Sequence, residues 1–197
     1  MATFRRSRDG LLTLDLRPVE ADVLASLARE VLELLGAPGE PAQRAVDPLA
    51  EELGLADLPS FGDHEGASPA VPPEDEVLRR LLPDAYGEDD PQAAAEFRRL
   101  TEAGLRERKA RAARGLLATL EPVAGQGGRV KLDADGARTW LAALNDIRLA
   151  LGTRLGVSDD PDEDPFDALA EEDPERYAWA VYDFATHLQE TLVRSLG

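Results

Sequence analysis

Four carboxylates in the acidic stretch 158–175 have residue types and spacing that could bind calcium. Their positions are Asp160, Asp162, Asp164 and Glu171. A calcium-binding loop needs alternating oxygen ligands, a bidentate glutamate near its end and a glycine at its sharp turn. Pro165 occupies the position that requires glycine. We therefore predict a solvated acidic loop and no metal site, because runs of like charge usually remain hydrated.

Histidine, serine and glycine offer no stronger catalytic pattern. His187 follows Asp183 by four residues, a spacing that commonly gives a contact on a helix surface. No second histidine lies near it to form a zinc-binding pair. Ser195 is not part of a nucleophile-turn motif, and the glycines of 125–128 lack the Gly-Lys-Ser or Gly-Lys-Thr ending of a phosphate loop. These patterns predict no enzyme activity and no cofactor.

A second set of charges makes one predicted helix basic. Its members are Arg98, Arg99, Arg106, Arg108, Lys109, Arg111 and Arg114. This is the best local candidate for binding an anion or nucleic acid. Glutamates at 96, 102 and 107 are interspersed, and opposite charges three or four residues apart pair on a helix. We therefore favour a salt-bridged, solvated helix face.

The remaining polar candidates interrupt apolar segments. They are Asp84, Tyr86, Asn145, Asp146 and Arg148, and with Arg98 and Arg99 they form the candidate partner or polar-network residues. One interpretation is an internal hydrogen-bond network that joins the helix carrying 145–148 to the LLPDAY turn of 81–86. The other is a groove that binds a segment of a partner. We favour the network, because an asparagine in a helix lowers helix propensity and needs a partner if it is buried.

The spacing of apolar residues predicts the elements that position these side chains. A hairpin over 3–16 turns at Arg8-Asp9-Gly10. Helices are predicted over 18–35, 41–53, about 77–82, 91–120, 133–151 and about 173–196, with a strand at 129–132. The apolar stripe of the 91–120 helix includes Phe97 and Leu100, and that of the last helix runs from Tyr177 to Leu196. The fold class is α+β and mainly α-helical, with five or six helices and a small antiparallel sheet built on the N-terminal hairpin.

Length and composition limit the remaining possibilities. We expect a single domain over 1–197, with mobile loops near 60–74 and 158–173. The net charge of −17 disfavours autonomous DNA binding, which depends on neutralisation of phosphates by Lys and Arg. The chain has no cysteine, so it can form no disulfide or thiol switch. No apolar run approaches the length of a membrane span, and we expect a cytoplasmic protein.

Two blocks carry a resemblance to a known family. They are LLPDAYGEDDPQAAAEFRRLTEAGLRERK over 81–109 and WLAALNDIRLALGTRLG over 140–156. The chain resembles the actinobacterial AosR-type regulators, a family formerly described as a domain of unknown function and typically encoded beside the ClpS protease adaptor. The resemblance implies a non-enzymatic cytoplasmic regulator of the oxidative-stress response that works with an extracytoplasmic-function sigma factor.

Four functional hypotheses follow from the sequence. The first is a regulatory protein that contacts a protein partner, such as a sigma factor, and DNA only indirectly. The second is a ClpS-linked adaptor in protein turnover, and the third is a metal-dependent hydrolase. The fourth is a sequence-specific DNA binder, which the net charge disfavours. The apolar helix stripes also allow a homodimer.

Overall fold

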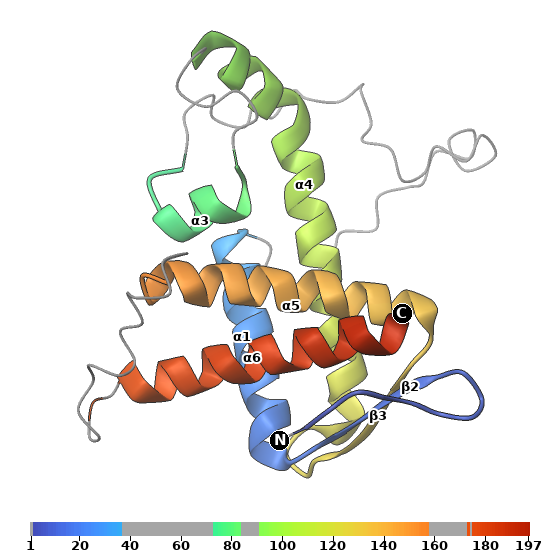
Figure 1. The fold of residues 1–197 in the computed structure, drawn as a ribbon. Helices are drawn as coiled ribbons and strands as arrows, with labels where there is room; N and C mark the ends of the chain where they lie inside the picture. Colours follow the sequence, from blue (N-terminus) through green and yellow to red (C-terminus); the bar gives the residue numbers. More distant parts are fainter. Residues whose placement is uncertain (1, 37–72, 84–90, 158–172, 174) are drawn as a thin grey trace, which may run out of the picture.

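Three strands and five α-helices make up the described part of the chain (Figure 1). The computed structural model describes residues 2–36, 73–83, 91–157, 173 and 175–197. The elements are β1 (Arg5–Arg6), β2 (Leu12–Leu16), α1 (Pro18–Leu34), α3 (Glu76–Leu81), α4 (Pro91–Leu120), the short 3₁₀ helix η1 (Glu121–Val123), β3 (Gly128–Leu132), α5 (Ala134–Arg154) and α6 (Glu175–Leu196). The predicted fold class is confirmed. The predicted helix 41–53 and most of both predicted loops lie outside the described residues.

The sheet is antiparallel, with the strand order β1-β2-β3. The predicted hairpin turn closes where Ser7 N donates to Leu11 O at 2.8 Å, and Gly10 has a φ of +85° that suits glycine. Along β2, Leu12, Leu14 and Leu16 are buried, whereas Thr13 and Asp15 point away from the core. One face of the sheet therefore packs against the helices, and the other faces solvent.

Polar groups at the ends of the helices explain where several of them begin. Asp133 Oδ1 accepts a hydrogen bond from Gly136 N at 2.8 Å at the start of α5. Asp173 Oδ1 accepts one from Glu175 N at 2.9 Å at the start of α6. At α1, Pro18 occupies the first turn, and Glu20 Oε2 accepts a hydrogen bond from Arg17 N at 2.8 Å. These local signals are visible in the sequence, which is why the predicted and observed starts agree.

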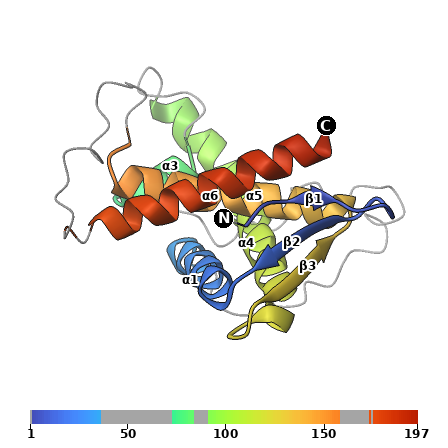
Figure 2. The same ribbon diagram turned by 60° about the horizontal axis from the view of Figure 1, so that its bottom comes forward.

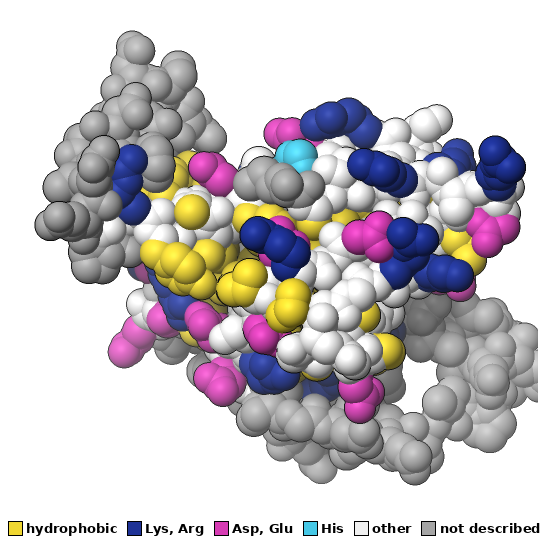
Figure 3. All heavy atoms as spheres, turned by 90° about the horizontal axis from the view of Figure 1, so that it is seen from below, with side chains coloured by type: hydrophobic (Ala, Val, Ile, Leu, Met, Phe, Trp, Pro, Cys, Tyr) yellow, Lys and Arg dark blue, Asp and Glu magenta, His cyan; other side chains and the backbone are white. Residues whose placement is uncertain are grey.

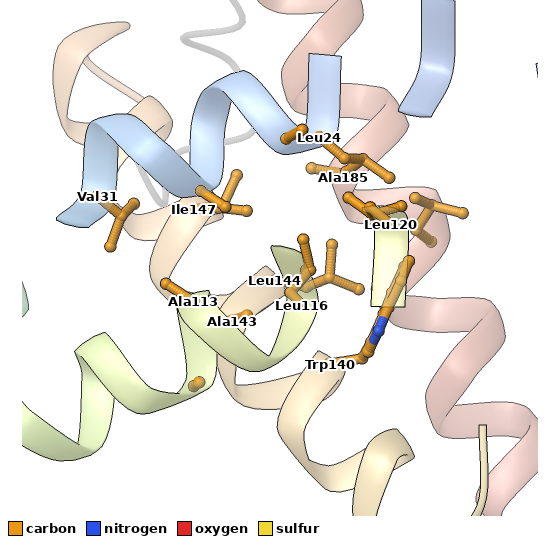
Figure 4. Close-up of a cluster of buried hydrophobic side chains, with 14 of the residues drawn as sticks. Leu24, Val31, Ala113, Leu116, Leu120, Trp140, Ala143, Leu144, Ile147 and Ala185 are labelled. Carbon is orange, nitrogen blue, oxygen red and sulfur yellow. The ribbon is translucent and has the colours of Figure 1, made fainter. Parts of the chain in front are cut away.

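The helices form a packed core around α5. Helix α5 contacts α1, α3, α4 and α6, and β1 lies along the C-terminal half of α6 (Figures 1 and 2). Trp140, Leu144 and Ile147 of α5 lie in the centre of the apolar cluster (Figure 4). The Trp140 indole donates to Thr119 Oγ1 at 2.7 Å, and its ring meets Phe4 edge-on at 5.6 Å between centroids. This core joins the sheet to all five described α-helices.

The apolar stripes predicted for α4 and α6 are partly wrong. Phe97 and Leu100 are 38% and 41% exposed, whereas the buried residues of this part of α4 include Arg98 and Glu102. The first half of α4 extends beyond the layer formed by α1, α5 and α6, so among the described residues it faces no broad apolar surface (Figure 1). At the two ends of α6, Tyr177 and Leu196 are also exposed. Among the described residues, no helix is long and apolar enough to cross a membrane.

Candidate functional site on helices α4, α5 and α6

A buried ion pair joins α4 to α5. Lys109 Nζ lies 2.5 Å from Asp146 Oδ1, and the two side chains are 15% and 5% exposed. Burial raises the pKa of the Asp146 carboxyl, while the hydrogen bond and charge of Lys109 oppose this rise without cancelling it. The pair therefore places a carboxyl group and an ammonium group together in the interface between the two helices.

Asn145 belongs to this site only at its edge. Its side chain is exposed, so it does not need a buried partner, and the predicted network with Asp84 and Tyr86 lies partly outside the described residues. A hydrogen bond from Asn145 also favours the charged form of Asp146 and lowers its pKa. The physical reason is the helical period of 3.6 residues, which turns position 145 outward when Leu144, Asp146 and Ile147 face the core.

Arg148 makes a separate connection, from α5 to α6. Its Nε donates to Thr186 Oγ1 at 2.9 Å, and its Nη1 donates to Gln189 Oε1 at 2.7 Å. The guanidinium also lies over the Tyr182 ring, 5.6 Å from the centroid. Three side chains of one helix thus hold Arg148, which indicates a structural role between α5 and α6.

A third cluster lies on the first half of α4. Glu102 is 5% exposed and accepts hydrogen bonds at Oε1 from Arg106 Nε and Nη2, at 2.9 and 2.8 Å. Arg98, itself 6% exposed, approaches the other carboxylate oxygen at 3.8 Å. Arg106 Nη1 then donates to Leu35 O at 3.1 Å, at the C-terminal end of α1, where the helix dipole favours a cation. The ion pairs that we expected on this helix are present, but Arg98 and Glu102 are buried rather than solvated, and Arg106 also connects α4 to α1.

The same cluster borders a shallow hollow between α3 and α4. The hollow is lined by Leu82, Pro83, Phe97, Arg98, Thr101, Glu102 and Leu105. Arg99 and Leu100 are exposed on the same turns of α4, but they do not line the hollow. Apolar surface with a charged rim is typical of protein contacts. We refer to the hollow together with Arg99 and Leu100 as the α3–α4 surface.

The predicted site residues are therefore distributed over three separate clusters. Asp84 and Tyr86 lie outside the described residues, so the predicted link to the LLPDAY turn stays a prediction. Instead, Asp146 pairs with Lys109 of α4, and Arg148 pairs with α6. The i,i+4 spacing of Arg98, Glu102 and Arg106 was a usable signal for their cluster. The partners of Arg148 on α6 had no such signal, because they are 38 and 41 residues away.

The histidine and serine that the sequence singled out make hydrogen bonds within the fold. No group of three or more His, Asp or Glu side chains there is arranged to hold a metal ion. His187 Nε2 lies 3.2 Å from Thr3 Oγ1, and Ser195 Oγ donates to Thr191 O at 2.8 Å. The predicted calcium-loop positions lie outside the described residues, so the expected absence of a site there stays a prediction.

Comparison with known proteins shows a family that covers nearly the whole chain. The model of a family described as "Domain of unknown function (DUF2017)" matches residues 1–196. Two similar proteins, from Mycobacterium tuberculosis strain H37Rv and Mycobacterium bovis, are both called "Oxidative stress regulator AosR". Each is 35% identical over 190 residues, covering 90% of this chain and 78% of the relative.

A Mycobacterium leprae relative extends this comparison. It is called "Putative oxidative stress regulator AosR" and is 38% identical over 142 residues, covering 66% of this chain and 62% of the relative. No solved structure matches. The chain therefore belongs to the DUF2017 family, which includes the AosR oxidative stress regulators.

Proposed function

We propose that this protein is a non-enzymatic, cytoplasmic regulator of the oxidative-stress response that acts through contacts with a component of the transcription apparatus. One observation carries the proposal, namely the 35% identity over 190 residues to proteins called oxidative stress regulators. That similarity covers 90% of the chain, and the family match spans residues 1–196, which include all three polar clusters.

The geometry of the clusters supports a role in binding rather than catalysis. Lys109, Asp146 and Arg148 are occupied in holding helices together, and Glu102 is enclosed by two arginines. These groups maintain the packing of α4 against α1 and α5, and of α5 against α6. Because these groups hold the helices together, we place the contact with a partner at the α3–α4 surface.

The α3–α4 surface has suitable chemistry for a protein partner. Leu100 is 41% exposed on α4 next to the exposed Arg99, and Phe97, one turn earlier, is 38% exposed and lines the hollow. Exposed apolar side chains that are surrounded by polar ones mark contact sites, and arginine is common at such sites. A partner that covers Leu100 would remove apolar surface from water.

The net charge and the amino-acid composition limit which class of partner fits the protein and how a redox signal could reach it. The net charge of −17 favours a protein with a basic surface and opposes an approach to DNA by the free chain. We propose an extracytoplasmic-function sigma factor as that partner. The chain contains no cysteine, so the redox signal would reach it through the partner rather than through a thiol of its own.

Affinity capture of the full chain from its native cells, followed by mass spectrometry, tests the proposal. We expect a sigma factor to co-purify at about 0.15 M salt and to be reduced at about 1 M salt, where screening is stronger. Leu100→Ser should weaken the capture, whereas Val193→Ser should not. Val193 is a matched control because it is a 51% exposed aliphatic residue on another helix.

Three results would contradict the proposal. Enrichment of the Clp chaperone or its adaptor in place of a transcription component would favour a role in protein turnover. Equal capture by Leu100→Ser and wild type would place the contact elsewhere. Turnover of a metal-dependent hydrolytic substrate by the purified chain would show an enzyme.

A further inference from the structure

The sheet ends in a strand with an open edge. Strand β3 pairs with β2 on one side, and among the described residues the backbone of 129–132 makes no other backbone hydrogen bond. At the other edge of the sheet, next to β1, the backbone is bonded to α6, because Phe4 N donates to Thr191 Oγ1 and Ser195 Oγ donates to Phe4 O. Strand β3 is the strand remote from α6 (Figure 2). An open edge presents unpaired N–H and C=O groups to which another extended chain can bond.

Basic side chains lie on the outer face of the sheet, with Lys131 on β3 itself and Arg5 two strands away on β1. The strand register aligns Arg5, Thr13 and Lys131 across the three strands. Arg129 forms an ion pair with Asp15 at 2.8 Å. Among the described residues, Arg5 and Lys131 form no ion pair, and the same holds for Arg6 and Arg8 of the hairpin.

The net charge of this outer face is opposite in sign to that of the whole molecule. On the outer face, the strand register places Arg5, Arg129 and Lys131 with one acidic residue, Asp15, a net charge of +2, whereas the chain carries −17. Figure 3 shows dark-blue side chains gathered over the part of the surface that the sheet occupies, with fewer magenta ones among them. The surface is therefore complementary to a short acidic segment.

We propose that the open edge of β3 binds an extended acidic segment of a partner protein, which adds to the sheet as a fourth strand. Successive side chains of such a strand point to opposite faces of the sheet. Those on the outer face would meet Lys131, and those on the inner face would lie beside Val130 and Leu132, which are buried. The segment should therefore alternate acidic and apolar residues.

A peptide fits this edge better than a nucleic acid does. The backbone groups of β3 match those of another peptide strand, and main-chain hydrogen bonds supply the affinity in strand addition. A long polyanion would also be repelled by the net charge of −17, whereas a short segment meets mainly the local positive face. This surface is distinct from the α3–α4 surface, so the inference does not depend on the proposed function.

The test uses the full chain and a synthetic peptide of about ten alternating glutamate and valine residues, the length of a long strand. We expect saturable binding by fluorescence anisotropy at about 0.05 M salt, with NMR shifts at the amides of 129–132. Lys131→Glu should weaken binding about tenfold, and Arg5→Glu, whose charge lies two strands further from the edge, should weaken it less. Arg79→Glu is the matched control, since it reverses an exposed charge on α3, away from the sheet.

A modified peptide separates strand addition from simple charge attraction without changing the protein. N-methylation of alternate residues keeps the charge but removes the hydrogen bonds along one edge of the peptide, and it should abolish binding. Equal binding of the methylated peptide, of polyglutamate interrupted by proline, or of a single-stranded oligonucleotide would overturn the proposal. So would the absence of binding at low salt, or NMR shifts that are confined to other elements.

Discussion

Replacing Lys109 with methionine would leave a carboxylate without its cation between α4 and α5. The Lys109–Asp146 pair is short, at 2.5 Å, and its side chains are only 15% and 5% exposed. Removing one partner of a buried pair costs about 3–5 kcal/mol, because the remaining charge is no longer compensated. We expect Lys109→Met to lower the free energy of unfolding by about 3 kcal/mol at neutral pH. The value lies at the lower end because Asp146 can take up a proton in the variant, which limits the cost to 1.36 kcal/mol per unit of pKa change.

The pH dependence of this loss has a defined sign. Burial already raises the pKa of Asp146 in the folded protein above its ordinary value. A raised pKa favours the protonated carboxyl in the folded state, so the associated stability is present below the unfolded pKa and is lost as pH rises through the folded pKa. Without Lys109 the folded pKa should rise further. The deficit of Lys109→Met relative to wild type should therefore be largest near neutral pH and smaller near about pH 4.

Urea unfolding of four proteins measures this effect. They are wild type, Lys109→Met, Asp146→Leu and the double variant, each at neutral and acidic pH. The double variant removes both charges, and we expect it to be within about 1 kcal/mol of wild type, since apolar replacement of a buried pair is often neutral. If the losses of the two single variants simply add in the double variant, or if the Lys109→Met deficit is independent of pH, the ion pair does not act as described.

Four further outcomes follow from the structure and sequence. Gly115→Ala should cost about 1–3 kcal/mol, because its Cβ would lie 2.6 Å from Thr139 Cγ2, and Thr139→Ser, which removes that methyl group, should restore much of the loss in a thermal melt. Glu20→Gln should lower stability by about 1 kcal/mol at neutral pH. Burial raises the Glu20 pKa, but the hydrogen bonds from Arg17 lower it by more, so the net effect is a lowered pKa. In urea melts, the stability difference between Glu20→Gln and wild type should therefore disappear as pH falls through the folded pKa. In mobility-shift assays at about 0.15 M salt, the purified chain alone should not bind promoter DNA tightly, and sequence-selective binding would contradict this expectation. Calorimetric titration with calcium, zinc or magnesium should show no binding at unit stoichiometry, and micromolar affinity would refute the interpretation of 158–175 as a metal-free acidic loop.

Local patterns explain most of what was predicted correctly. The Asp-Gly turn at 9–10 and the alternation of leucines after it predict the hairpin. Asp133 marks the start of α5, and Gly36, with a φ of +65°, follows the end of α1. Each signal depends on residues within a few positions of one another. Such interactions form in the same way wherever the segment lies in the fold.

Exposure along α4 shows where local patterns are insufficient. Phe97 and Leu100 have the spacing of a buried stripe, yet the buried residues between and after them are Arg98 and Glu102. Whether an apolar side chain is buried depends on what the rest of the chain places opposite it. The first half of α4 projects past the main helical layer, and the paired charges there replace an apolar contact (Figure 1).

The sequence by itself determined the class of fold, the element boundaries in most described segments, the acidic charge and the exclusion of a thiol switch. These properties follow from composition, periodicity and short-range hydrogen bonding. Only the tertiary structure decided that Asp146 meets Lys109, that Arg148 connects to α6 and that Arg5 and Lys131 share one face of the sheet. Such contacts join residues that are distant along the chain, and helix packing and strand register, rather than spacing in the sequence, set their geometry.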